Sequence, residues 1–135
     1  VATGLIRSGI MYSLVKHKIP YVLAGSIRDD GPLPGVYSDN LAAQDAMREH
    51  TVKATGAVFV ATALHAIAVG NMLPAFYLCD GVPLPLMTIC VDQTEFVVNK
   101  LRDRGTHQAY GVVTNAQDFM HVLRFYTERW EQGSS

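Results

Sequence analysis

Two patterns of apolar residues alternate along the chain. In some stretches apolar residues recur every three or four positions, as in an amphipathic helix. In others a short run is apolar throughout, as in a strand buried within a parallel sheet. The first pattern predicts helices at residues 5–16, 39–50, 93–104 and 116–130. The second pattern predicts strands at residues 19–24, 57–63, 87–91 and 110–114.

Helix and strand therefore alternate, with connections between strands that are too long for hairpins. This alternation predicts an α/β fold, a Rossmann-like parallel sheet of about four or more strands with helices on both faces. Two segments follow neither pattern clearly. Residues 65–73 indicate a short helix interrupted at Gly70-Asn71, and residues 75–87 indicate a loop or a small hairpin. We expect one domain over residues 1–131 and a disordered tail at residues 132–135.

Composition excludes several classes of protein. With 11 basic and 12 acidic residues and no basic run, the chain has no signature of nucleic-acid binding. No apolar run approaches the length of a membrane span. Cys79 and Cys90 lack the spacing of metal ligands, so we expect no metal site and a cytoplasmic protein with reduced thiols, with a disulfide between them as the alternative. The chain starts at Val1 inside an amphipathic pattern, which predicts a piece of a longer polypeptide. Its hydrophobic content of 49% suits such a piece or an oligomer.

Polar side chains at the predicted strand ends are the first candidates for chemistry. The dinucleotide fingerprint G-x-G-x-x-G is absent. Asp92, however, directly follows a predicted strand and precedes a helix, where a carboxylate can bind both hydroxyls of a ribose or simply cap the helix. At the next strand end, Asn115 and Ala116 lie where the edge of an adenine would be, although Asn115 can equally be a helix cap.

Two further segments contain candidate groups. Gly70-Asn71 can leave the backbone N–H groups of Asn71, Met72 and Leu73 free to face a pyrophosphate, or can form a plain turn. His65 can act as an acid or base, or be a core histidine. Asp30, beside Asp29 in a loop with two prolines and two glycines, can bind an ammonium group, take a proton or pair with Arg28.

Several motifs in order resemble those of a known family: AGSIRDDGPLP, AQDAMREH, HAIAVGN-LP, CVD and GVVTNAQDF. They are similar to the C-terminal region of the lysine-oxoglutarate reductase/saccharopine dehydrogenase-like (LOR/SDH-like) family. That family includes archaeal-type ornithine cyclodeaminases and cyanobacterial bifunctional arginine dihydrolase/ornithine cyclodeaminases. The resemblance covers nearly the whole chain and is weakest over residues 75–87.

The resemblance implies an NAD-dependent ornithine cyclodeaminase, which converts L-ornithine to L-proline and ammonia by hydride transfer to and from bound NAD. It also implies a cytoplasmic homo-oligomer in which this part, without the rest of its parent chain, is inactive. Asp30 is the first choice for the substrate ammonium or the proton shuttle, and His65 is the second. The cofactor positions are Asp39, Asn71, Met72, Leu73, Asp92, Asn115 and Ala116.

Two alternatives stay open at this point. The first is an NAD-dependent amino-acid oxidoreductase of the saccharopine dehydrogenase type. The second is a non-catalytic nucleotide-binding or assembly domain that keeps the fold without the chemistry.

Overall fold

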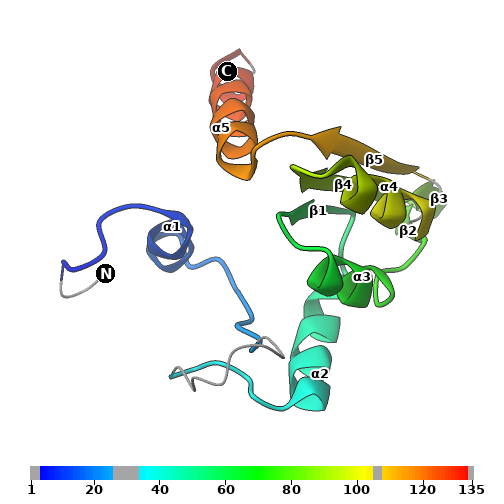
Figure 1. Cartoon of the computed structure of the whole chain (residues 1–135), viewed down its shortest axis with the longest axis horizontal. Coiled ribbons are helices and arrows are strands. Elements are labelled where there is room, and N and C mark those ends of the chain that lie inside the picture. Colours follow the sequence, from blue (N-terminus) through cyan, green and yellow to red (C-terminus); the bar gives the residue numbers. More distant parts are fainter. Residues whose placement is uncertain (1–3, 26–33, 105–107, 134–135) are drawn as a thin grey trace. The chain divides into compact units, whose positions relative to one another are not determined.

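The computed structural model describes residues 4–25, 34–104 and 108–133, and the chain divides into two compact units, residues 1–47 and 48–135 (Figure 1). The first unit contains helix α1 (Ile10–Lys16) and most of α2 (Asn40–Thr51). The helix predicted from residue 5 begins only at Ile10, because Gly9 has φ 95°, which a right-handed helix does not accommodate.

The strand predicted at residues 19–24 is wrong for most of that segment. Within the described residues it contributes one parallel bridge, between Ala24 and Tyr37. Two backbone hydrogen bonds hold the bridge, from Gly25 N to Tyr37 O (3.0 Å) and from Tyr37 N to Leu23 O (2.8 Å). Lys18 has φ 53° and Pro20 has no N–H group, so the start of the segment is poorly suited to extended pairing. An apolar run becomes a strand only where a neighbour accepts its hydrogen bonds.

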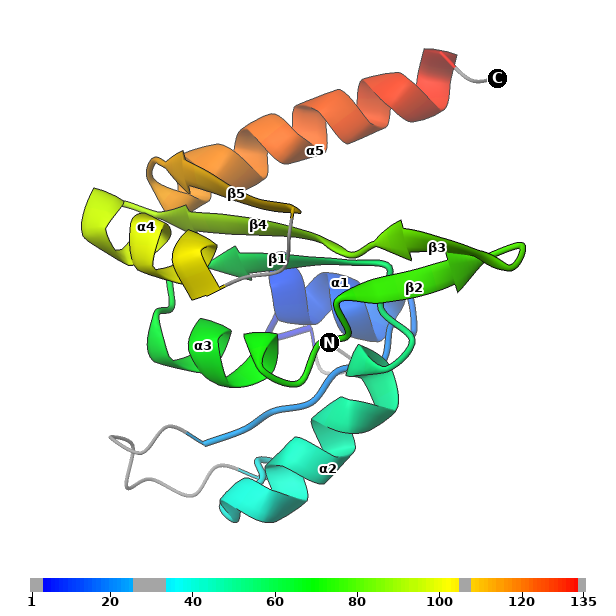
Figure 2. The same ribbon diagram turned by 90° about the vertical axis from the view of Figure 1, so that its right-hand side faces the viewer.

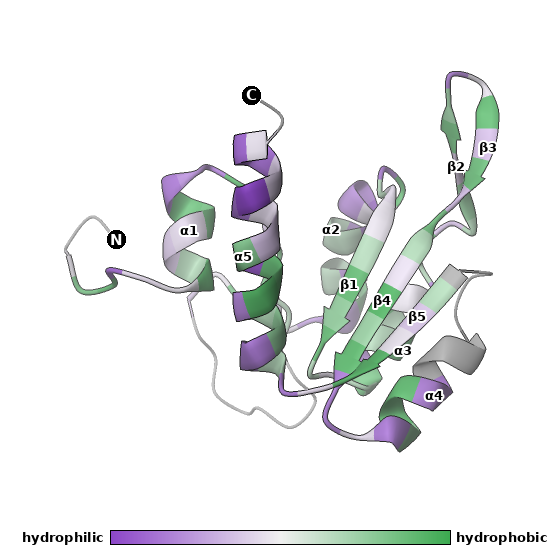
Figure 3. Ribbon diagram, turned by 90° about the horizontal axis from the view of Figure 1, so that it is seen from above, coloured by the Kyte–Doolittle hydropathy of each residue, from purple (hydrophilic) through white to green (hydrophobic). Residues whose placement is uncertain are grey.

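The second unit is built on a parallel sheet with the strand order β1-β4-β5. The strands are β1 (Gly56–Val60), β4 (Met87–Asp92) and β5 (Gln108–Val113) (Figure 3). β4 has a partner on each side, which explains why its apolar run is the most buried of the three. The α/β Rossmann-type prediction is confirmed, but in the described part of the chain the sheet has three strands rather than about four.

The helices α3 (Leu64–Gly70) and α4 (Glu95–Arg104) belong to one side of this sheet (Figure 2). Ala66 of α3 and Cys90 of β4 are both 2% exposed and form the centre of the core. Phe59, Ile67 and Val97 pack against this pair. The core therefore joins β1, β4, α3 and α4 into one body and holds the strand ends in place.

Residues 76–85 form the small hairpin that was one of the two predicted possibilities. β2 (Phe76–Cys79) pairs antiparallel with β3 (Val82–Pro85). The turn residues Asp80 and Gly81 have φ values of 52° and 79°, the left-handed conformation that a two-residue type I′ turn needs.

The last helix, α5 (Ala116–Gly133), has 18 residues and extends two residues into the predicted tail. None of the helices in the described part of the chain combines the length and the apolar composition that crossing a bilayer requires.

Candidate functional site

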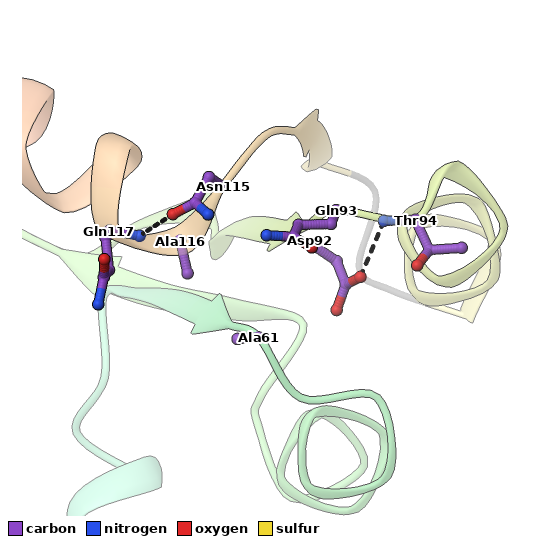
Figure 4. A pocket seen from close by; sticks show the side chains of 7 residues that line it. All are labelled: Ala61, Asp92, Gln93, Thr94, Asn115, Ala116 and Gln117. Atoms are coloured by element: carbon purple, nitrogen blue, oxygen red, sulfur yellow. Dashed lines mark hydrogen bonds between the residues drawn. The ribbon is translucent and has the colours of Figure 1, made fainter.

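The carboxyl ends of the three parallel strands enclose a pocket of about 510 Å³ (Figure 4). The strands bring these ends together because the sheet is in register, with Val60 beside Val91 and Asp92 beside Val113. Ligands of open α/β sheets bind at this edge. The residues that line the pocket follow β1, β4 and β5: Ala61, Asp92, Gln93, Thr94, Asn115, Ala116 and Gln117.

Asp92 supplies the one charge among these seven residues, and it is partly buried. Its Oδ1 accepts a hydrogen bond from the backbone N–H of Thr94 (2.9 Å), which stands immediately before α4. This bond fixes the orientation of the carboxylate. Figure 4 shows the second carboxylate oxygen turned away from the Thr94 N–H group. Asp92 therefore stabilises the start of α4 and still presents an acceptor to a ligand.

Asn115 caps α5. Its Oδ1 accepts hydrogen bonds from Gln117 N (2.8 Å) and Asp118 N (3.4 Å), two of the N–H groups that lack a partner at a helix start. The capping interpretation of Asn115 is thus confirmed. The cap uses only the oxygen, so the amide nitrogen remains a donor on the pocket side in Figure 4.

Small residues leave room between these polar groups. Ala61 directly follows β1 and has φ 55°, in the left-handed region, while its N–H donates to Val91 O (2.9 Å). Ala116 lines the pocket at the start of α5.

Sequence reasoning found Asp92, Asn115 and Ala116 but missed the other four lining residues. Gln93 and Gln117 follow the two strand ends closely, so the rule that ligands bind beyond strand ends could have found them. No pattern in the sequence identifies Ala61 as a lining residue, because its backbone has a left-handed φ that alanine rarely adopts.

The prediction of free N–H groups at Asn71, Met72 and Leu73 is wrong. These groups donate to Ile67 O (3.1 Å), Val69 O (2.9 Å) and Gly70 O (3.3 Å), respectively. The physical reason is the direction of α3. The three residues follow its C-terminal end, where N–H groups close the last turns and the helix dipole disfavours an anion. None of the three lines the pocket beside Asp92.

His65 is also not part of that pocket. It is exposed in the first turn of α3, and its Nδ1 lies 3.1 Å from Thr62 Oγ1. The interpretation as a buried core histidine is therefore wrong. His65 and Leu73 border a second cavity of about 400 Å³, which has a mainly apolar lining from β1 and α3.

The remaining candidates lie in the first unit. Asp39 caps α2 through a hydrogen bond from Ala42 N to its Oδ1 (2.8 Å). Asp30 lies outside the described residues. Among the described residues, His, Cys, Asp and Glu nowhere gather in a group of three that could hold a metal ion.

This chain is similar to known proteins over nearly its whole length. Residues 1–123 match the family model described as arginine dihydrolase ArgZ-like, C-terminal, Rossmann fold. The chain is 44% identical over 131 residues to an ornithine cyclodeaminase of Methanococcus maripaludis, and the match covers 97% of this chain and 29% of that protein. It is 46% identical to the bifunctional arginine dihydrolase/ornithine cyclodeaminase AgrE of a Nostoc species, covering 91% of this chain and 16% of AgrE.

A solved structure shows the same fold. The ternary complex of AgrE with ornithine and NAD⁺ superposes with a TM-score of 0.81 at 40% identity, over 98% of this chain and 18% of AgrE. The chain thus spans less than a third of the length of the curated relatives it matches.

Proposed function

Because this chain belongs to the family of ArgZ-like C-terminal Rossmann-fold domains, we propose that it is the nucleotide-binding part of an NAD-dependent ornithine cyclodeaminase. The reaction converts L-ornithine to L-proline and ammonia. The names of the relatives support this activity, and the observation that carries the binding role is the fixed Asp92 carboxylate in the pocket beyond the strand ends.

The residues of the pocket fit the adenosine half of NAD. The oxygen of Asp92 that Thr94 leaves open is an acceptor for ribose hydroxyls. The amide nitrogen of Asn115 is a donor for an adenine ring nitrogen, and the two alanines leave space for flat groups. The carboxylate of Asp92 repels a 2′-phosphate, so the pocket favours NAD over NADP.

The chemistry that bound NAD supplies is acceptance and return of one hydride within a single catalytic cycle. The residues of this chain hold and orient the participants. We propose Asp30 for the substrate ammonium or for proton transfer, with His65 as the second candidate. The contact with Thr62 orients the imidazole of His65. Asp39 is proposed to lie near the cofactor, in addition to its role as a cap of α2.

Replacing Asp92 with asparagine tests the binding role. Asp92→Asn keeps an oxygen for Thr94 N, so α4 keeps its start, but it removes the charge and the second acceptor. We expect a loss of about 1–3 kcal/mol of NAD binding, or about 5- to 150-fold in Kd, measured by isothermal titration calorimetry. Asp80→Asn is the matched control, because Asp80 lies in the hairpin turn and asparagine suits that conformation. Equal NAD affinity in the two variants would exclude Asp92 from the site.

Turnover by the full-length protein separates the activities. Ornithine with NAD should yield proline without net NADH. Accumulation of NADH would instead indicate an oxidoreductase of the saccharopine dehydrogenase type, and NAD binding without turnover would indicate a non-catalytic domain. Asp30→Asn is expected to lower turnover while leaving NAD affinity unchanged, and unchanged turnover would remove Asp30 from the proposed site.

A further inference from the structure

The hairpin of β2 and β3, here named the ribbon (residues 76–85), is apolar on both faces and extends from the amino end of β4, opposite the pocket (Figures 2 and 3). Phe76 is 57% exposed and Leu78 is 67% exposed on one face. Val82 and Leu84 are 56% and 37% exposed on the other. Two-stranded hairpins are marginal in water without further cover. The ribbon therefore has the properties of an interface rather than of a solvated loop.

The two edges of the ribbon differ in their hydrogen-bonding groups. In an antiparallel pair, residues alternately direct their N–H and C=O groups toward the partner strand or away from it. Leu86 N donates to Ala75 O (3.0 Å), and the residues that flank a two-residue turn also bond each other. Hydrogen-bonded pairs recur every second residue between these two points, so Val82, Leu84 and Leu86 direct their backbone groups toward β2. Pro83 and Pro85 lie between them and direct their backbone groups outward. Proline has no N–H group, so the outer edge of β3 offers acceptors without donors.

The outer edge of β2 has both backbone donors and backbone acceptors. The same alternation directs the N–H and C=O groups of Phe76 and Leu78 outward, opposite the two prolines. In the described part of the chain β2 pairs with no strand other than β3. An edge strand of this kind, without charge, proline or bulge, is a template for another strand.

We propose that β2 pairs antiparallel with β2 of a second copy of this chain, around a two-fold axis at Tyr77. Phe76 of each copy then exchanges both backbone hydrogen bonds with Leu78 of the other, so the edge is complementary to itself. The result is one four-stranded sheet bounded on both sides by the proline edges of β3, which stops further addition of strands.

Charge does not oppose this occupant. The strands of the ribbon carry no charged residue, and its single carboxylate, Asp80, lies in the turn. In the two-fold register the two turns lie at opposite ends of the four-stranded sheet, so the two carboxylates stay apart. The interface lies at the end of β4 remote from Asp92 and is independent of the proposed function.

Disulfide trapping in the full-length protein tests the register. Two Tyr77 residues would face each other as a non-hydrogen-bonded pair with Cα atoms about 4.5 Å apart, a separation that a disulfide spans. In a Cys79→Ser background, Tyr77→Cys should therefore give a covalent dimer under mild oxidation. Leu84→Cys is the matched control. It lies on the same face but three strand spacings, about 14 Å, from its copy, and should remain uncrosslinked.

A second variant tests the same interface without cysteine chemistry. Leu78→Pro removes an outward N–H group of β2 and no hydrogen bond within the ribbon, because Leu78 occupies a non-hydrogen-bonded position. We expect the mass from sedimentation equilibrium to fall to half that of the unmodified protein, with an unchanged circular dichroism spectrum. If Tyr77→Cys crosslinks no more than Leu84→Cys, or if Leu78→Pro keeps the full mass, then the ribbon is covered by something other than a second copy and the proposal fails.

Discussion

Gly111 of β5 lies directly against Val98 of α4. A Cβ atom at this position would overlap Cγ1 of Val98 and would also lie 3.6 Å from Val98 Cβ. Val98 is 3% exposed, and a helical valine is largely restricted to one χ1 rotamer, so this side chain has nowhere to turn. The substitution Gly111→Ala must therefore push α4 away from β5.

Two opposing effects set the magnitude. Overpacking a tight core costs about 1–3 kcal/mol. Replacing glycine restricts the unfolded chain and returns about 0.4–1 kcal/mol. The clash wins, and we expect Gly111→Ala to lower the free energy of unfolding by about 1–2 kcal/mol. With a urea m-value of about 1–2 kcal/mol/M, the unfolding midpoint shifts down by about 1 M.

A double-mutant cycle, measured by urea unfolding, isolates the contact. Val98→Ala alone removes two buried methyl groups and costs about 2 kcal/mol. In the double variant the new Cβ at residue 111 occupies the vacated space, so the combined cost should fall about 1–2 kcal/mol short of the sum. Gly70→Ala is the control, because its Cβ would lie 3.9 Å from Phe59 Cζ, an ordinary contact. Additive costs, or a Gly111→Ala variant as stable as the Gly70→Ala control, would refute the packing argument.

Three further predictions concern the core and the pocket rim. Ala61→Gly should raise the free energy of unfolding by about 1 kcal/mol, because glycine relieves the left-handed φ of 55°. Ala57→Gly, in the body of β1, is the control and should lower the free energy of unfolding. A loss of stability in Ala61→Gly would show that the backbone at residue 61 is unstrained. Thr88→Val should raise the free energy of unfolding by about 1 kcal/mol, measured by thermal or urea unfolding. The reason is that the Thr88 hydroxyl is buried without a hydrogen-bond partner in the described residues. A destabilised variant would mean that this hydroxyl is hydrogen-bonded. Burial raises the pKa of the Cys90 thiol, so at pH 8.5 iodoacetamide should modify exposed Cys79 in the native protein and both cysteines in urea. Native labelling of Cys90 would contradict its burial. Because the folded pKa of Cys90 lies above the unfolded one, the stability contributed by this thiol is complete below the unfolded pKa and is lost as pH rises toward the folded pKa.

The sequence predicted most of the secondary structure of the second unit because the signals there are local. The apolar run before Asp92 has the composition of a buried strand and became β4, and the helical spacing after Asn115 became α5. Asp80-Gly81 is itself a hairpin signal, and residues 76–85 form that hairpin.

One prediction failed because the answer depended on a distant partner, and another failed because the direction of a short helix decided which N–H groups were free. Residues 19–24 have strand-like residues, yet within the described chain only Ala24 pairs, since a strand exists only with a neighbour. Residues 71–73 were assigned to an anion from a glycine and an asparagine. The direction of α3 instead places their N–H groups on its last carbonyls.

The candidate site shows the same division. The order of residues alone determined that a carboxylate at 92 and an amide at 115 follow consecutive strands, and parallel pairing makes such ends neighbours. Local bonds then occupy one atom of each group, because the Thr94 N–H donates to one oxygen of Asp92 and the Gln117 N–H donates to the oxygen of Asn115. Only the tertiary structure decided what surrounds the remaining atoms, because the pairing of β1 with β4 brings Ala61 to the same pocket. Periodicity, composition and helix caps act over a few residues, whereas the set of residues that line a pocket depends on contacts between elements that the chain brings together only on folding.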